Sequence, residues 1–77
     1  MPVLTIHVRR VDERWVRKGY TGRVRKFDVF DVDGQVYETW DAWCASLCDR
    51  YRQSGQPVKI WTRDTRYGPE IVKAEAA

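Results

Sequence analysis

The sequence predicts an all-β fold, a small five-stranded β-barrel with one helix, in the order strand, strand, strand, helix, strand, strand. Apolar and polar residues alternate in several short segments, one segment shows the apolar spacing of a helix, and Asp33-Gly34 marks a hairpin turn. The 77 residues allow one domain, expected over 1–77 with the terminal residues 75–77 frayed.

The first strand is predicted over Val3–Val11, where Leu4 and Ile6 share one apolar face and polar residues occupy the other. This alternation breaks from Asp12 to Gly22. The glycines and charges of that segment indicate a long connection, although Trp15 and the valine after it could extend a strand into it.

The second and third strands are predicted over Arg23–Val32 and Gln35–Thr39. Asp33-Gly34 joins them, and a type I′ turn needs a positive φ at both of its central residues. In the second strand the apolar side chains point to both faces. This pattern indicates either two partly covered faces or a bulge that changes the facing midway.

One helix is predicted over Asp41–Ser54, capped by Asp41 or Thr39 and ended by Gly55 and Pro57. Its apolar stripe at positions i, i+3, i+4 and i+7 consists of Cys44, Leu47, Cys48 and Tyr51. Leu47 lies at the centre of this stripe. Trp40 and Trp43 flank it and are expected in the core.

The last two strands are predicted over Val58–Arg63 and Glu70–Ala74, with a short loop at Asp64–Pro69 between them. Val58, Ile60 and Thr62 alternate with the residues of the opposite face. This phase points Trp61 outward.

Charge and residue content narrow the possible functions. The net charge is +3 and ten of the 14 cations are arginines, while four Trp, four Tyr and two Phe are many rings for so small a core. No apolar run reaches the roughly 20 residues of a membrane helix, and the N-terminus lacks the pattern of a signal peptide. We therefore expect a cytoplasmic protein that does not bind a membrane.

Catalytic and metal-binding patterns are also missing from the sequence. His7 has no obvious partner, and Cys44 and Cys48 supply only two of the roughly four ligands of a zinc site. No phosphate-binding glycine loop or nucleophile motif occurs. The expectation is reduced, buried thiols in a protein that is no enzyme and has no cofactor and no metal.

Three segments carry a family resemblance. Residues 26–41, Lys-Phe-Asp-Val-Phe-Asp-Val-Asp-Gly-Gln-Val-Tyr-Glu-Thr-Trp-Asp, combine an aromatic strand, an Asp-Gly turn and a Thr followed by an aromatic residue and Asp at a helix start. Together with residues 55–60 and 67–73, this stretch resembles the small single-domain OB-fold (oligonucleotide/oligosaccharide-binding) proteins of bacteria and phages, distant relatives of the replication protein A barrels.

The resemblance implies that single-stranded nucleic acid binds the face of the second and third strands. It also implies that the segments Asp12–Gly22 and Asp64–Pro69 frame that face, and both contain aromatic and basic residues. Asp28 and Asp31 depart from this pattern, because carboxylates on that face would repel phosphate.

The candidate binding site is centred on Trp61, whose strand face also carries Lys59 and Arg63. An aromatic ring between two cations can stack on a base while the cations contact phosphate. The site residues expected for nucleic acid are Trp61, Lys59, Arg63, Arg25, Arg23, Trp15, Arg17, Lys18, Tyr20, Arg66 and Tyr67. Alternatively, Trp61 packs against the helix or the first connection under the two cations, and Arg23 and Arg25 pair with Asp28 or Glu38.

Two functions follow. The first is a single-stranded DNA- or RNA-binding module of low sequence specificity. The alternative is an adaptor, encoded by a phage or mobile element, that uses the barrel for protein–protein interaction as a monomer or weak homodimer. Clustering of the cations on one face favours nucleic acid, and an apolar patch away from them favours a protein partner.

Overall fold

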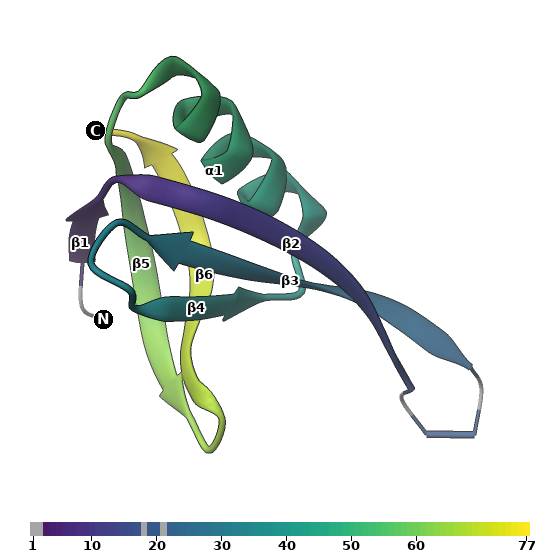
Figure 1. Ribbon diagram of the computed structural model, residues 1–77. Helices are drawn as coiled ribbons and strands as arrows, with labels where there is room; N and C mark the ends of the chain where they lie inside the picture. Colours follow the sequence, from purple (N-terminus) through teal and green to yellow (C-terminus); the bar gives the residue numbers. More distant parts are fainter. Residues whose placement is uncertain (1–2, 18, 21) are drawn as a thin grey trace.

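The chain forms a single mixed sheet with one helix packed on it (Figure 1). The computed structural model describes residues 3–17, 19–20 and 22–77. Over these ranges the elements are β1 (Val3–Ile6), β2 (Val8–Arg17), β3 (Arg23–Asp31), β4 (Val36–Thr39), α1 (Ala42–Ser54), β5 (Val58–Thr65) and β6 (Gly68–Ala76).

The strand order in the sheet is β1-β5-β6-β4-β3-β2. Neighbouring strands are antiparallel except for β4 and β6, which are parallel. The all-β class with one helix is confirmed. The five-stranded barrel is wrong in two respects, because the described residues form six strands and because the sheet is not closed into a barrel.

The extra strand arises at His7, where the first predicted strand breaks in two. β1 pairs with β5 at one edge of the sheet, and β2 pairs with β3 at the other edge. His7 lies between them, and its carbonyl accepts a hydrogen bond from the Val32 backbone N–H at 2.9 Å. One bent segment thus supplies both edges, and no ladder joins β1 to β2 within the described ranges.

β2 and β3 form a long hairpin arm that projects from the body of the molecule (Figure 1). The predicted connection at Asp12–Gly22 is wrong over its first half, because β2 continues to Arg17, which pairs with Arg23. Opposite charges across the two strands support the arm, including Arg25 and Glu13 at 3.6 Å. The arm contributes to an elongated molecule of 39 × 25 × 20 Å.

The core lies between the sheet and α1. Its fully buried members include Val29, Cys48, Val58 and Ile60, whereas Leu47 packs against it only partly buried. Three core assignments from the sequence are wrong: Leu4, Trp40 and Trp43 are exposed. Leu4 lies on the short edge strand β1, where no further strand covers it.

The predicted helix is confirmed as α1. The Asp41 side chain caps it by accepting a hydrogen bond from the Trp43 N–H, and Gly55 ends it with φ 74°. Among the helices in the described ranges, none is long and apolar enough to cross a membrane.

The turn at Asp33-Gly34 joins β3 to β4 as predicted, but its type is different. Gly34 has φ 91°, and no described residue other than glycine has a positive φ, so a type I′ turn is excluded. Asp31 organises the turn instead, since its Oδ1 accepts hydrogen bonds from the N–H groups of Asp33 and Gln35, both at 2.9 Å. Asp31 is therefore occupied in the turn and does not face a ligand.

The last hairpin is tighter and longer than the sequence predicts. β5 and β6 pair from Val58↔Ala76 to Thr65↔Gly68, so most of the predicted loop at Asp64–Pro69 is strand. Residues 75 and 76, predicted to fray, belong to β6. The turn that remains, at Arg66 and Tyr67, places the Tyr67 side chain at the tip of the hairpin.

Candidate nucleic-acid interface

A groove of about 690 Å³ lies between the β2–β3 arm and the β5–β6 hairpin. Both hairpins project downwards in the view of Figure 1, with β4 between them in the sheet. The groove is lined by Arg14 and Val16 of β2, Lys26 of β3, Glu38 of β4, Trp40, Arg63 and Thr65 of β5, Tyr67, and Glu70 of β6. These residues lie on the sheet face opposite α1, because Phe27, the neighbour of Lys26, faces the helix.

Lys26 lies at the centre of the groove and is only 7% exposed. Its Nζ is 4.9 Å from the centroid of the Trp40 ring and 5.7 Å from that of Tyr67. Both distances are within the range of a cation–π interaction. Because Trp40 is 41% and Tyr67 is 73% exposed, the groove presents two accessible rings around one ammonium group.

Carboxylates neutralise the cations of the groove. Lys26 Nζ lies 2.8 Å from Glu38 Oε2, Arg14 Nη2 lies 3.5 Å from Glu38 Oε1, and Arg63 Nε lies 2.8 Å from Glu70 Oε1. Arg14 Nε also lies 3.1 Å from Asp28 Oδ2. The acid that the sequence places on this face, Asp28, is thus held by an arginine.

Three other cations lie at the ends of the two hairpins. Arg17 and Arg23 are exposed at the end of the β2–β3 arm, and Arg66 is exposed at the tip of the β5–β6 hairpin. In the part of the chain that the structure describes, no carboxylate pairs with any of these three. Arg17 and Arg23 share the arm face of Trp15 and Arg25, opposite the groove, whereas Arg66 directly precedes the groove residue Tyr67.

The predicted site residues divide among several places. Arg63 and Tyr67 line the groove. Trp61 lies on β5 two residues before Arg63, half-buried, with Lys73 Nζ at 4.6 Å and Lys59 Nζ at 5.1 Å from its ring centroid. Trp61 lies on the outward strand face that the sequence predicts, but it does not line the groove.

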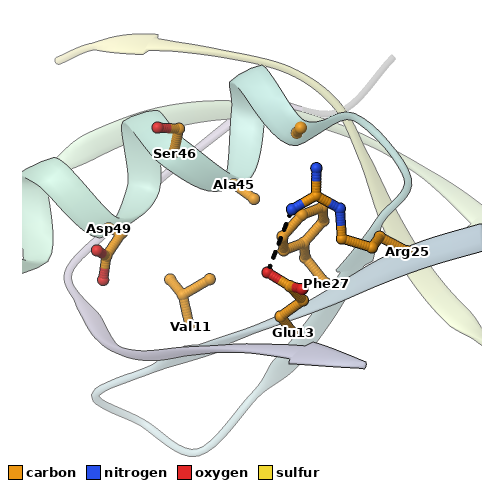
Figure 2. Close-up of a pocket in the computed structure, with 8 residues that line it drawn as sticks. Val11, Glu13, Arg25, Phe27, Ala45, Ser46 and Asp49 are labelled. Atoms are coloured by element: carbon orange, nitrogen blue, oxygen red, sulfur yellow. Dashed lines mark ion pairs between the residues drawn. The ribbon is translucent and has the colours of Figure 1, made fainter. Parts of the chain in front are cut away.

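Trp15 and Arg25 lie on the other face of the arm, the one directed towards α1. Figure 2 shows Arg25 with Glu13 and Phe27 in a hollow of about 320 Å³ that α1 covers with Ala45 and other small residues. The only aromatic ring lining this hollow, Phe27, is buried. The hollow therefore offers no ring for stacking, and Arg25 pairs with Glu13 rather than with Asp28 or Glu38 as the sequence allowed.

The remaining predicted residues are at the end of the arm. Tyr20 lies in the connection between β2 and β3, after Arg17 and before Arg23 in the sequence, and it is fully exposed. Lys18, the other residue predicted there, lies outside the described residues.

Sequence reasoning missed the two residues at the centre of the groove, Lys26 and Trp40. Trp40 was assigned to the core because it precedes the helical stripe. The period-2 pattern of β4 could have found it, because Tyr37 and Thr39 are buried while Val36, Glu38 and Trp40 occupy the opposite phase. In the same way, Lys26 alternates with the buried Phe27 and Val29.

The two thiols, by contrast, are poorly suited to chemistry at neutral pH. Burial raises the pKa of Cys44 to about 11, with a further contribution from Asp41, and raises the pKa of Cys48 to about 12. Burial and the nearby Asp31 and Asp33 also raise the pKa of Tyr37. Across residues 3–17, 19–20 and 22–77, no group of three or more His, Cys, Asp or Glu side chains could hold a metal ion.

Comparison with known protein families, with characterised proteins and with solved structures finds no match to this chain.

Proposed function

We propose that the chain is a single-stranded nucleic-acid-binding module of low overall sequence specificity. The strand lies in the groove between the two hairpins and stacks its bases on Trp40 and Tyr67. The single observation that carries this proposal is the pair of accessible rings within 6 Å of Lys26 Nζ. Each base stacked on an aromatic side chain contributes about 1–3 kcal/mol, whatever its identity.

Stacking outweighs charge in this proposal. The cations inside the groove are already paired with carboxylates, so a phosphate gains little from them. Arg66, next to Tyr67, remains for the backbone at the groove, whereas Arg17 and Arg23 lie on the opposite face of the arm. The expected salt dependence therefore corresponds to about one phosphate contact, because each neutralised phosphate of a single strand contributes roughly 0.7 to the slope of log K against log salt.

The proposed relation to the OB-fold proteins is consistent with this placement. If β1 and β2 are counted as one strand bent at His7, the element order becomes that of the OB-fold, which is itself a partly open barrel. In that fold, ligands bind the face of the second and third strands and the loops that join strands one to two and four to five. The groove occupies the corresponding position.

The test is fluorescence anisotropy with labelled dT12 and rU12 at 20 and 200 mM salt. We expect binding of both strands. We also expect Tyr67→Ala and Trp40→Ala each to weaken binding by about 5- to 150-fold, the loss of one stacked base. Trp61→Ala is expected to have a smaller effect, because its ring lies beside the groove.

Trp43→Ala is the matched control, because Trp43 is 66% exposed on α1 and does not line the groove. This variant should bind like the wild type. Absence of binding by the wild type at 20 mM salt would remove the nucleic-acid proposal. Equal losses for Trp43→Ala and Trp40→Ala would place the strand elsewhere.

A protein partner is the second proposal, and the distribution of charge favours it. The cations do not gather on one face: Arg14 and Arg63 line the groove, whereas Arg25 lies on the α1 side. Trp43 and the edge-strand residues Val3 and Leu4 are exposed apolar side chains away from the groove. An adaptor would lose its partner on substitution of these residues and would show no salt-dependent oligonucleotide binding.

A further inference from the structure

Two carboxylates line the groove, although carboxylates repel the phosphates of a nucleic acid. Glu38 of β4 and Glu70 of β6 are register partners across the parallel strand pair, and both line the groove. Their side chains are 17% and 11% exposed, so they are mostly withdrawn from water yet remain accessible at the groove wall. Such carboxylates cost free energy unless they accept hydrogen bonds.

Each carboxylate has a cation beside it and further capacity to accept. The two oxygens of Glu38 face Lys26 at 2.8 Å and Arg14 at 3.5 Å. Glu70 Oε1 accepts the hydrogen bond of Arg63 at 2.8 Å. Because an ionised carboxylate offers about four lone-pair sites, both groups can accept more hydrogen bonds.

In the groove, the ammonium donor of Lys26 lies next to the carboxylate acceptors of Glu38. This arrangement is complementary to a base edge that presents an acceptor followed by donors. The Watson–Crick edge of guanine presents the acceptor O6 and then two adjacent donors, N1–H and the N2 amino group. Adenine, cytosine and thymine each present only one donor group on that edge. Lys26 Nζ lies within 6 Å of both ring centroids and Glu38 Oε2 lies 2.8 Å from Nζ, so this donor–acceptor pair adjoins the two rings on which bases are proposed to stack.

We propose that the groove prefers guanine among the bases it stacks, with Lys26 donating to O6 and Glu38 accepting from N1–H and the N2 amino group. The inference rests on the proposed function and assigns a base to the site. It also gives the carboxylates a role: they repel phosphate but accept the donors of a guanine. Neighbouring positions of the strand remain nonspecific, because their bases meet only ring faces.

The experiment compares labelled 12-mers of thymidine with one central substitution by guanine, inosine, adenine or cytosine. A single guanine avoids self-association of guanine runs. We expect the guanine strand to bind about 5- to 150-fold more tightly than the thymine strand, the range of a good bidentate base contact. Inosine lacks the N2 amino group and should lose most of this gain.

Glu38→Gln replaces one acceptor oxygen with a donor of the same size, and Glu75→Gln, an exposed position outside the groove, is the matched control. We expect Glu38→Gln to reduce the guanine preference, measured as the ratio of the affinities for the guanine and thymine strands, to less than about twofold. The control should retain the preference. Circular dichroism checks the fold of both variants.

Equal binding of the guanine, inosine and thymine strands by the wild type would overturn the guanine preference and leave the stacking function standing. A guanine preference that survives in Glu38→Gln would overturn the assignment of Glu38. No binding of any strand would remove the proposed function as well. The inosine comparison decides the question with the wild type alone if Glu38→Gln does not fold.

Discussion

Lys26→Met tests whether the centre of the groove is built around a buried ammonium group. The substitution keeps an unbranched side chain of similar length but removes the charge, which lies 2.8 Å from Glu38 Oε2 and within 6 Å of two aromatic rings. Removing one partner of a fully buried ion pair costs about 3–5 kcal/mol. Glu38 keeps Arg14 at 3.5 Å and some contact with water, so we expect a smaller loss of about 1–3 kcal/mol.

In a domain of this size, 1 kcal/mol shifts the melting temperature by about 4–8 °C. Lys26→Met should therefore lower it by roughly 5–20 °C in a thermal melt followed by circular dichroism. Arg52→Met is the matched control, because Arg52 pairs with Asp49 at 2.7 Å on the exposed helix surface. Such surface pairs contribute only about 0.2–1 kcal/mol.

A double-mutant cycle with Glu38→Gln isolates the interaction between the two residues. We expect a coupling free energy of about 1 kcal/mol or more, since the residues are in direct contact. A stabilising role for the buried Lys26–Glu38 ion pair is refuted if Lys26→Met melts within 2 °C of the wild type, or if it loses no more stability than Arg52→Met. Either result would mean that Lys26 is as solvated as a surface lysine.

Three further predictions concern the fold. Ile60→Ala should lower the free energy of unfolding in urea by about 2–5 kcal/mol, because Ile60 is fully buried. Leu47→Ala should lower it clearly less, because Leu47 is only partly buried. Equal losses for the two variants would contradict the core described above. Gly34→Ala should cost about 1 kcal/mol through its positive φ of 91° alone, since no atom lies within 4 Å of the added Cβ; an unchanged stability would contradict the turn geometry. Burial raises the pKa values of Cys44 and Cys48 in the folded protein to about 11 and 12. Their contribution to stability is therefore full below pH 9 and falls as the pH rises from 9 to 12. If the melting temperature is constant from pH 9 to 12, or falls equally in Cys48→Ala, these thiols are not the cause of a loss of stability at high pH.

Local signals in the sequence predicted the helix and most strand centres. The Asp41 cap, the apolar stripe and Gly55 act within a few residues, so α1 could be placed to within one residue. The hairpin at Gly34 could be placed too, but its turn type could not. Asp31 binds two backbone N–H groups of the turn and selects another conformation, and this contact is not visible as a dipeptide pattern.

Long-range pairing decided what the sequence could not. Glu13, Arg14 and Arg17 look like a solvated connection, and only the cross-strand partners on β3 make that segment a strand. Likewise, the break at His7 depends on two different partner strands, β5 before it and β3 after it. The alternation of apolar and polar residues predicts which face of the sheet a residue occupies, but it does not predict which strand will pair with the segment.

The candidate site was only half predictable for the same reason. Arg63 could be selected because it shares a predicted strand face with Trp61, and Tyr67 because it is an aromatic residue of the predicted loop at Asp64–Pro69. The periodicity of β3 and β4 puts Lys26 and Trp40 on the face opposite the core, but it does not show that they meet, because the groove forms only when β3, β4 and the β5–β6 hairpin come together. The outward phase of Trp61 was predictable, whereas its distance from the groove depends on strand order.

The four tryptophans provide the most direct test of where a strand binds, because Trp15, Trp40, Trp43 and Trp61 lie on four different parts of the surface. Their indole N–H groups give four separate signals in a two-dimensional ¹H–¹⁵N NMR spectrum. During titration with dT12, the Trp40 signal should shift most, the Trp61 signal less, and the Trp43 signal should stay in place. A shift of the Trp43 or Trp15 signal with an unmoved Trp40 signal would contradict the assignment of the groove as the binding site.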